Sequence, residues 1–517
     1  MSTGINLKIL KNHMQNKNEL NIATNNLPLL KHINPDNYDP SKPEIAHDII
    51  VQLFEPLFKY KLTKPSEKKS FDIGALQGSL ASSIKTKNSG LTYEVTLKKS
   101  GDSNGIPITS SDVLDSWQGA FQNRQIGRWV AMMGSVPRNE HSLEIIDEKR
   151  IRFNLESPNL LFPHLLTMLV PSITRSSNTR TDRNKLNTEE IYKTGFGPYQ
   201  IESTNEQGWS LEANSYHWKE KTFFKKINYL LINNNQDSRL QHLINKEIDM
   251  IFAPTIDEIK KIKQDTSINI FRSLGNTRVA LQISFKHEPL MDINIRKAIS
   301  LTIPYNDIIE KVYDGNAVQW NGIVPHSVIG SIKFNKLIQN IADAKELMAK
   351  SSFKEFNSEL IVDKDSKDSM QIAKIIQKSL SIIGISIQII CLERKVFRSR
   401  QIAGDFQLAI DRDLYRCNEL GYILPHDFGD KKHGITNWNK YSNDTVNMLF
   451  KQAKETNNYK KRIQILQQSQ KIIFSDLPWI PIALPTFNIL HKKNISGITW
   501  NPRLSGYPSY NMLKWKE

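Results

Sequence analysis

Cysteine is scarce in this chain of 517 residues, which contains only Cys391 and Cys417. Neither belongs to a C-x-x-C pair, so the spacing excludes the common structural zinc sites. His426 and His433 flank an aspartate-containing loop, but two histidines without a third ligand at compact spacing do not predict a metal centre. We therefore expect no metal and no cofactor. Cys391 lies in an apolar run and is predicted to be a small core residue, and whether the two cysteines pair stays open.

Long hydrophobic runs are also missing. The longest apolar piece near the N-terminus is Ile9-Leu10, so no signal peptide is predicted there. No other stretch is long enough to predict a membrane span. Three explanations stay open: an export signal that was trimmed from the sequence, a misplaced start codon, or a protein that remains in the cytoplasm.

The motifs of common enzyme classes are absent as well. The chain has no G-x-S-x-G, no H-E-x-x-H and no glycine-rich phosphate loop, which argues against an enzyme. Acidic residues are outnumbered 53 to 69 by lysine and arginine, giving a net charge of +16. The basic residues are scattered in doublets such as Lys98-Lys99 and Lys460-Lys461, and no cluster or helix-turn-helix predicts nucleic-acid binding. A basic field of this size could still attract an anionic ligand.

What the chain does contain is an alternation of predicted strands and helices between residues 193 and 302. Residues 226–232 and 248–252 are apolar and β-prone, whereas the leucines between them recur at helical spacing. Thr255 precedes two acidic residues and is predicted to cap a further helix. This alternation is typical of an α/β layer, and 517 residues are too many for one core, so two or three domains are expected.

Further elements follow from the same periodicities. The apolar spacing of residues 45–60 predicts one helix, and helices are also predicted over 443–454 and 460–473. Thr109 is predicted to cap a helix, with Asp112 reaching back to it. Gly384 should end the helix that begins near residue 369.

Four motifs in a fixed order carry a family resemblance: residues 195–199 (GFGPY), 213–218 (ANSYHW), 243–249 (LINKEID) and 289–298 (PLMDINIRKA). Together with residues 89–98 and 105–113, they resemble the family 5 extracellular solute-binding proteins. That family includes the oligopeptide-, dipeptide- and nickel-chelate-binding subunits of ABC importers.

The resemblance implies an α/β, two-lobe periplasmic-binding-protein fold, type II and cluster C-like, with an extra subdomain in the first lobe. Lobe I would comprise residues 1–45, 171–274 and 483–517, and the extra subdomain residues 46–170. Lobe II would comprise residues 275–482.

The resemblance also implies a function. The chain would be the substrate-binding subunit of an ABC importer, and would capture an oligopeptide or peptide-like ligand as the two lobes close. Its partners would be the membrane permease subunits, and it would act as a monomer in the periplasm or at the cell surface. Two alternatives are an acidic or metal-chelate ligand, and a cytosolic sensor or regulator that uses the same fold.

Candidate ligand-binding residues come from the family pattern. In peptide-binding members, the loop that corresponds to the stretch after Ile410 carries an aspartate that pairs with the ligand's ammonium group. An ungapped count places Arg416 at that position, with Asp411 or Asp413 available in a shifted register. A buried arginine there would favour a carboxylate or phosphate, although charged loop residues are more often solvated or paired with each other. The predicted set is Asn26, Trp129, Arg412, Asp413, Tyr415, Arg416 and Tyr507.

Overall fold

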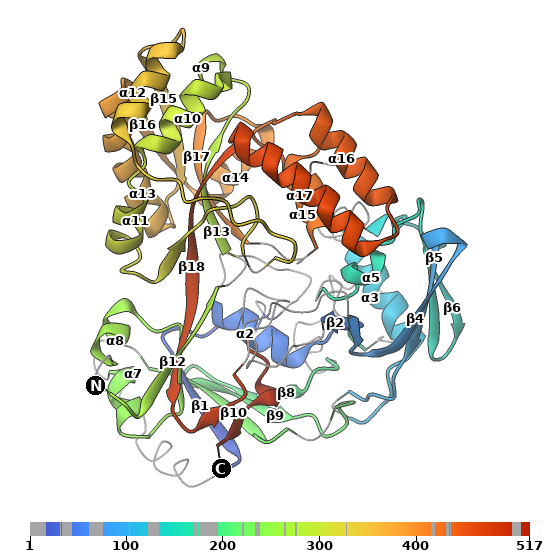
Figure 1. Cartoon of the computed structure of the whole chain (residues 1–517). Helices are drawn as coiled ribbons and strands as arrows, with labels where there is room; N and C mark the ends of the chain where they lie inside the picture. The colour runs from blue at the N-terminus through green and yellow to red at the C-terminus, as the bar shows by residue number, and fades with distance from the viewer. Residues whose placement is uncertain are drawn as a thin grey trace. The chain divides into compact units, whose positions relative to one another are not determined.

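The chain divides into two compact units, residues 1–273 with 487–517 and residues 274–486 (Figure 1). The computed structural model describes residues 17–30, 33, 44–60, 76–102, 104–122, 134–168, 173–175, 195–219, 222–232, 238–262, 265–274, 277–326, 328–414, 419–430, 434, 436–498 and 508–516. Strand β18 (Trp479–Lys492) leads from the second unit back into the first. Each unit combines strands and helices, which confirms the predicted α/β class.

The first unit is built on a mixed sheet in which β1 is central. β1 (Glu19–Thr24) pairs in parallel with β10 (Lys226–Leu231) and β11 (Met250–Phe252). Antiparallel β9 (Gly208–Ala213) and β8 (Tyr199–Thr204) extend it on one side, and β18 pairs with β11 on the other. The predicted strands over 226–232 and 248–252 are confirmed to within two residues.

Helices cover both faces of this sheet, so β1 is buried on both. On one face, Ile45 and Ile49 of helix α2 (Glu44–Leu53) join an apolar cluster together with Phe54, which follows the helix. Helices α7 (Arg239–Ile244) and α8 (Ile256–Lys261) pack with Ala23 and Leu490 in another. The predicted Thr255 cap is confirmed as a capping box with Glu258.

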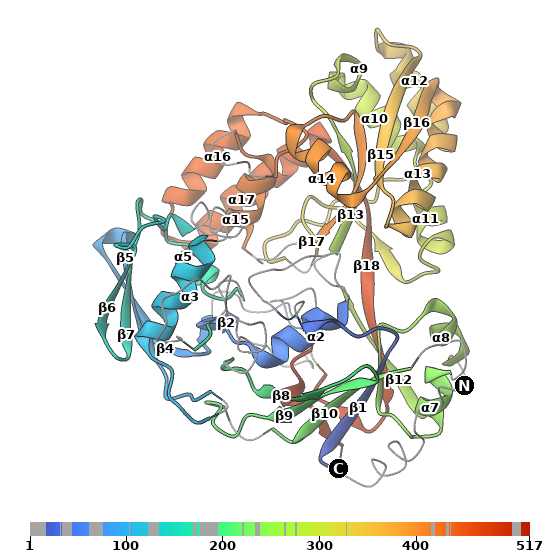
Figure 2. The same cartoon turned by 180° about the vertical axis from the view of Figure 1, so that it is seen from behind.

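A separate four-stranded sheet lies within the residues of the predicted extra subdomain (Figure 2). Its order is β4 (Ala81–Lys87), β5 (Thr92–Leu97), β7 (Arg150–Asn154) and β6 (Leu143–Asp147). Helix α3 (Ser110–Gln122) packs on it through Trp117, whose ring lies 5.0 Å from that of Phe153. The Asp112 carboxylate accepts from Thr109 N at 2.8 Å, as the predicted cap requires.

The second unit has its own sheet, in the order β16 (Ile385–Leu392), β15 (Phe356–Asp363), β17 (Leu408–Leu414), β13 (Thr277–Ile283) and β18. One apolar cluster joins the sheet to α10 (Ile293–Thr302), α11 (Tyr305–Lys311), α12 (Ile341–Lys350) and α13 (Lys367–Leu380). A second cluster involves α15 (Leu420–Phe428), α16 (Asp444–Glu455) and α17 (Tyr459–Asp476). Gly384 follows α13 and a short 3-10 turn with φ +82°, which confirms it as the stop.

The remaining short elements complete the described chain. They are β2 (Phe58–Tyr60), β3 (Leu76–Gly78), α5 (Phe162–Leu165), β12 (Ile268–Leu274), α9 (Glu288–Met291), β14 (Ala317–Gln319), α14 (Arg394–Ala403), β19 (Ile495–Ser496) and β20 (Lys514–Trp515). Among the described residues, no helix has the length and apolar character that a bilayer crossing requires.

Two predictions about local structure are wrong. The helix predicted over 45–60 ends at Leu53, and residues 58–60 form strand β2. Pro56 explains the break, because a proline disfavours helical backbone in the residue before it. Cys391 is exposed rather than in the core, because β16 is the edge strand of its sheet and its last residues are only partly covered.

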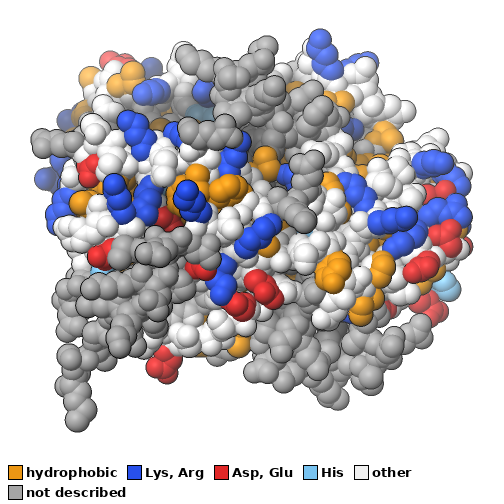
Figure 3. Space-filling model, turned by 90° about the horizontal axis from the view of Figure 1, so that it is seen from below, with side chains coloured by type: hydrophobic (Ala, Val, Ile, Leu, Met, Phe, Trp, Pro, Cys, Tyr) orange, Lys and Arg blue, Asp and Glu red, His pale blue; other side chains and the backbone are white. Residues whose placement is uncertain are grey.

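Basic side chains do not gather into one field on the face seen in Figure 3. Lysine and arginine lie there among acidic, apolar and neutral side chains.

Candidate functional site

In the second unit, charged side chains gather where three strands of the sheet end. Strands β15, β16 and β17 are parallel, so their carboxyl ends share one edge. Strand β13 runs antiparallel to β17 and places Arg278 opposite Asp413 at that edge. Ligands of open α/β sheets usually bind outside the carboxyl ends of strands. We call the group there the carboxyl-edge cluster: Arg278, Asp368, Arg398, Asp411, Arg412 and Asp413.

Asp411 is the buried centre of this cluster. Its Oδ2 lies 2.5 Å from Nη1 of Arg278, and its Oδ1 lies 3.1 Å from Nη1 of Arg398. The Gln401 amide donates to the same Oδ1 at 3.2 Å. Burial alone would raise the pKa of Asp411, but the two guanidinium groups outweigh it and hold the pKa below its ordinary value. Asp411 is therefore a charged anchor for both arginines.

Aromatic rings fix the same two arginines. The Arg278 guanidinium carbon lies 4.0 Å from the centroid of the Trp479 ring, and that of Arg398 lies 5.0 Å from the Trp438 ring. Stacking on an aromatic face suits the planar guanidinium group. Both arginines are thus held in position by a ring and a carboxylate.

Arg412 and Asp413 lie on a strand, which corrects the prediction that a loop begins after Ile410. Strand β17 continues to Leu414 because its residues pair with β13, where Arg412 is opposite Val279. An available backbone partner outweighs the weak β-propensity of charged residues. Only residues 415–418 remain for the loop, and they lie outside the described residues.

Arg412 and Asp413 each have a charged neighbour. Oδ2 of Asp413 lies 3.6 Å from Nη2 of Arg398, and Nε of Arg412 lies 3.4 Å from Oδ2 of Asp368. The Arg412 side chain is 41% exposed, so solvent reaches it. The cluster therefore presents both signs of charge, and its three arginines balance its three aspartates.

Comparison with known proteins decides the family. Residues 75–418 match the model of the bacterial extracellular solute-binding proteins, family 5. The chain belongs to this family. It is the solute-binding component of an ABC importer, and the family is one of extracellular binding proteins rather than enzymes.

Relatives of this family 5 protein match it over nearly its full length. The probable D,D-dipeptide-binding periplasmic protein DdpA of Escherichia coli K12 is 24% identical, over 93% of each chain. The oligopeptide-binding protein OppA of Bacillus subtilis is 23% identical, over 88% of this chain and 87% of its own. Among solved structures, HbpA2 of Haemophilus parasuis has a TM-score of 0.81 at 20% identity, covering 97% of this chain and all of that one.

The family 5 motifs of the first unit have structural roles. The turn of residues 195–199 packs against the end of α2, where Gly197 N donates to Leu53 O at 2.9 Å. A Cβ at Gly197 would lie 2.3 Å from the carbonyl carbon of Leu53, so only glycine fits. Asn214 donates from its amide to the carbonyls of Gly197 and Gly101 at 3.1 and 3.2 Å.

A buried glutamate joins the motif of residues 213–218 to the segment that precedes β4. Oε2 of Glu55 accepts from Trp218 Nε1 and from Ser79 Oγ, each at 2.6 Å. Lys98 lies over the Trp218 ring, 3.4 Å from its centroid. The motifs thus hold the four-stranded sheet region to the main sheet of the first unit.

The other predicted site residues fall into two groups. Asn26 is exposed just after β1, and the Thr24 hydroxyl donates to its carbonyl at 2.9 Å. Trp129, Tyr415, Arg416 and Tyr507 lie outside the described residues.

Sequence reasoning missed Arg278 and Arg398, the two arginines that surround Asp411. Arg278 could have been noticed in the sequence, because it is the one charged residue in the apolar strand 277–283; the structure shows it to be only 2% exposed. Arg398 lies in a helix with several other basic residues, and nothing in the pattern distinguishes it.

Proposed function

We propose that this family 5 protein captures an oligopeptide or a peptide-like ligand by closure of two lobes, and delivers it to membrane permease subunits. The similarity to a dipeptide-binding protein over 93% of both chains carries the proposal. A structural relative, DppA of Helicobacter pylori, was solved with the peptide STSA, at a TM-score of 0.74 and 20% identity. The lobes would follow the predicted boundaries, with residues 46–170 as a subdomain.

The carboxyl-edge cluster suits a ligand that carries both charges. A free peptide has an ammonium and a carboxylate terminus, and both need partners once water is removed. Arg412 would face the carboxylate, and Asp413 the ammonium group. A purely acidic ligand is less well matched, because the three arginines of the cluster are balanced by three aspartates.

Export is part of the same proposal. The relatives include a periplasmic protein by name, and the family is extracellular. We therefore propose a periplasmic or cell-surface location and a monomeric binding protein.

Native mass spectrometry of the purified protein tests the ligand class first. A retained mass that fragments as a peptide supports the proposal. A haem group or a nickel–histidine complex would overturn it, since relatives of this fold are described with those ligands.

Titration calorimetry with unmodified tripeptides then tests the site. Arg412→Gln and Asp413→Asn should each weaken binding by about tenfold or more, because a hydrogen bond to a charged group contributes ~1.5–3 kcal/mol. Arg400→Gln is the matched control, because Arg400 lies in the same unit but pairs with Glu359 and Asp405. Equal losses in all three variants would contradict the assigned site.

A further inference from the structure

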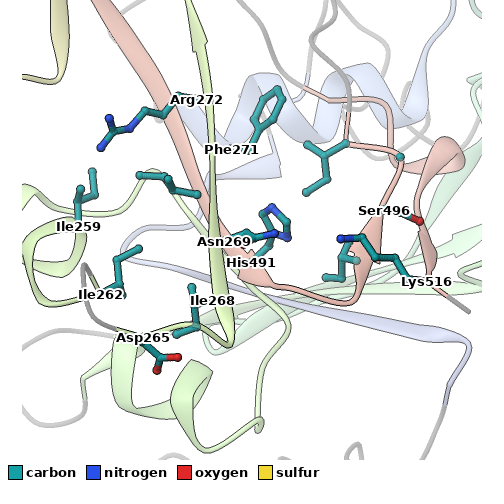
Figure 4. Close-up of a pocket in the computed structure, with 14 residues that line it drawn as sticks. Ile259, Ile262, Asp265, Ile268, Asn269, Phe271, Arg272, His491, Ser496 and Lys516 are labelled. Atoms are coloured by element: carbon teal, nitrogen blue, oxygen red, sulfur yellow. The ribbon is translucent and has the colours of Figure 1, made fainter. Parts of the chain in front are cut away.

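A pocket in the first unit shares no residue with the carboxyl-edge cluster and follows strand β12 (Figure 4). Its volume is about 520 Å³. Five consecutive residues of β12, 268–272, line it, together with residues from α8, the end of β18, and the chain around β19 and β20.

The first compartment is lined mainly by isoleucines, with Asp265 at its margin (Figure 4). Ile268 and Ile270 lie on the same face of β12 and pack with Ile259 and Ile262. Arg272 lies on the same face of β12, two residues after Ile270, and its side chain is exposed at the end of this compartment. No salt-bridge partner of Arg272 is found among the described residues.

The second compartment, on the other face of β12, is more polar. Asn269 and Phe271 point into it, and His491 of β18 and Lys516 lie across from them. His491 Nδ1 lies 2.8 Å from the carbonyl of Lys492 and donates to it, which leaves Nε2 as an acceptor. Burial lowers the pKa of His491, and Lys516 lowers it further, so the ring is neutral at pH 7. The Lys516 ammonium has no salt-bridge partner within the described part of the chain.

The edge itself supplies backbone groups. Within the described strands, β12 pairs only with β18, so its other edge carries no strand. An unpaired edge presents a row of N–H and C=O groups that another extended chain can use.

We propose that this edge binds an extended peptide segment of alternating apolar and acidic residues, which pairs with β12 as an added strand. Apolar side chains would enter the isoleucine compartment, and acidic side chains, which point to the opposite face of the added strand, would face Lys516. Alternation is required because neighbouring side chains of a strand point to opposite faces. The segment needs no free terminus, unlike a peptide captured as cargo.

A peptide blocked at both ends provides the probe. Acetyl-EVDIEV-amide has neither an ammonium nor a carboxylate terminus, so it separates this site from the cargo site. Fluorescence anisotropy of a labelled form should show saturable binding, and acetyl-KVKIKV-amide should bind at least several-fold more weakly. The decisive readout is amide hydrogen exchange: residues 268–272 should gain protection when the acidic peptide is bound, because a paired strand occupies their backbone groups.

Charge reversal tests the role of Lys516. Lys516→Glu should weaken binding of the acidic peptide several-fold, since an exposed attractive pair becomes a repulsive one. The matched control, Lys514→Glu, makes the same change of charge at an exposed position that does not line the pocket.

Three results would overturn the proposal: no binding of the acidic peptide, binding without protection of residues 268–272, or an equal loss in the Lys514→Glu control. The outcome is separable from the proposed function. The Lys516→Glu variant should still retain the cargo seen by native mass spectrometry.

Discussion

Replacing Asp48 by asparagine should change how the stability of the first unit depends on pH. Asp48 lies on α2 and is fully buried, and the Tyr229 hydroxyl donates to its Oδ2 at 2.8 Å. Its Oδ1 has no hydrogen-bond partner among the described residues. Burial raises the pKa of Asp48 from its ordinary 3.8 to about 7, although Tyr229 and Tyr510 partly offset the shift.

The direction of the effect follows from linkage. The folded state holds the proton more tightly than the unfolded state, so the stabilisation is fully present below about pH 3.8. It is lost as the pH rises towards about 7. A shift of about three pKa units corresponds to a change on the order of 4 kcal/mol in the free energy of unfolding. Asparagine resembles the neutral acid, so Asp48→Asn should remove this loss and be the more stable form at pH 8.

Amide hydrogen exchange is the suitable assay, because a chain of two units has no single free energy of unfolding. Peptides from α2 and β10 should be compared at pH 5 and pH 8, after correction for intrinsic exchange rates. Asp257→Asn is the control, since Asp257 is exposed on α8 of the same unit. The reasoning fails if the difference between wild type and Asp48→Asn is the same at both pH values, or if the variant is less protected at pH 8.

Three further predictions concern packing and buried charge. Gly197→Ala should lower the free energy of opening of the first unit by ~1–3 kcal/mol, measured as faster amide exchange in α2 and β8 peptides, because the new Cβ meets the Leu53 backbone; unchanged exchange there would contradict the required close approach. Glu258→Gln should lower the stability of the first unit by ~3–5 kcal/mol, since the fully buried Arg239 loses the carboxylate that lies 2.6 Å from it. Amide exchange in peptides from α7 and α8 should become faster, and unchanged exchange would contradict the prediction. Asp411→Asn should cost a similar amount in the second unit, seen as faster exchange in β13 and β17, and normal protection there would refute its role as the anchor of two arginines.

Local chemistry explains which elements could be predicted. Thr255 and Thr109 were recognisable as caps because capping depends on residues within three positions. Gly384 was recognisable as a helix stop for the same reason, because a glycine that follows an amphipathic run is a local signal. Cys391 was misplaced because an apolar strand gives no sign of whether it lies at the centre or the edge of a sheet.

The sequence by itself determined the family, the α/β class and most helix starts, because motif order, periodicity and caps are properties of neighbouring residues. Only the tertiary structure decided which charges meet. Asp411 contacts Arg278 across 133 positions of the chain, and their pairing depends on the register of β13 with β17. It also decided that β12, among the described strands, pairs on one edge only, since the number of neighbours of a strand is set by the whole sheet. Long-range pairing of this kind leaves no pattern in neighbouring residues. Burial then determines how much each pair of charges contributes to the free energy of folding.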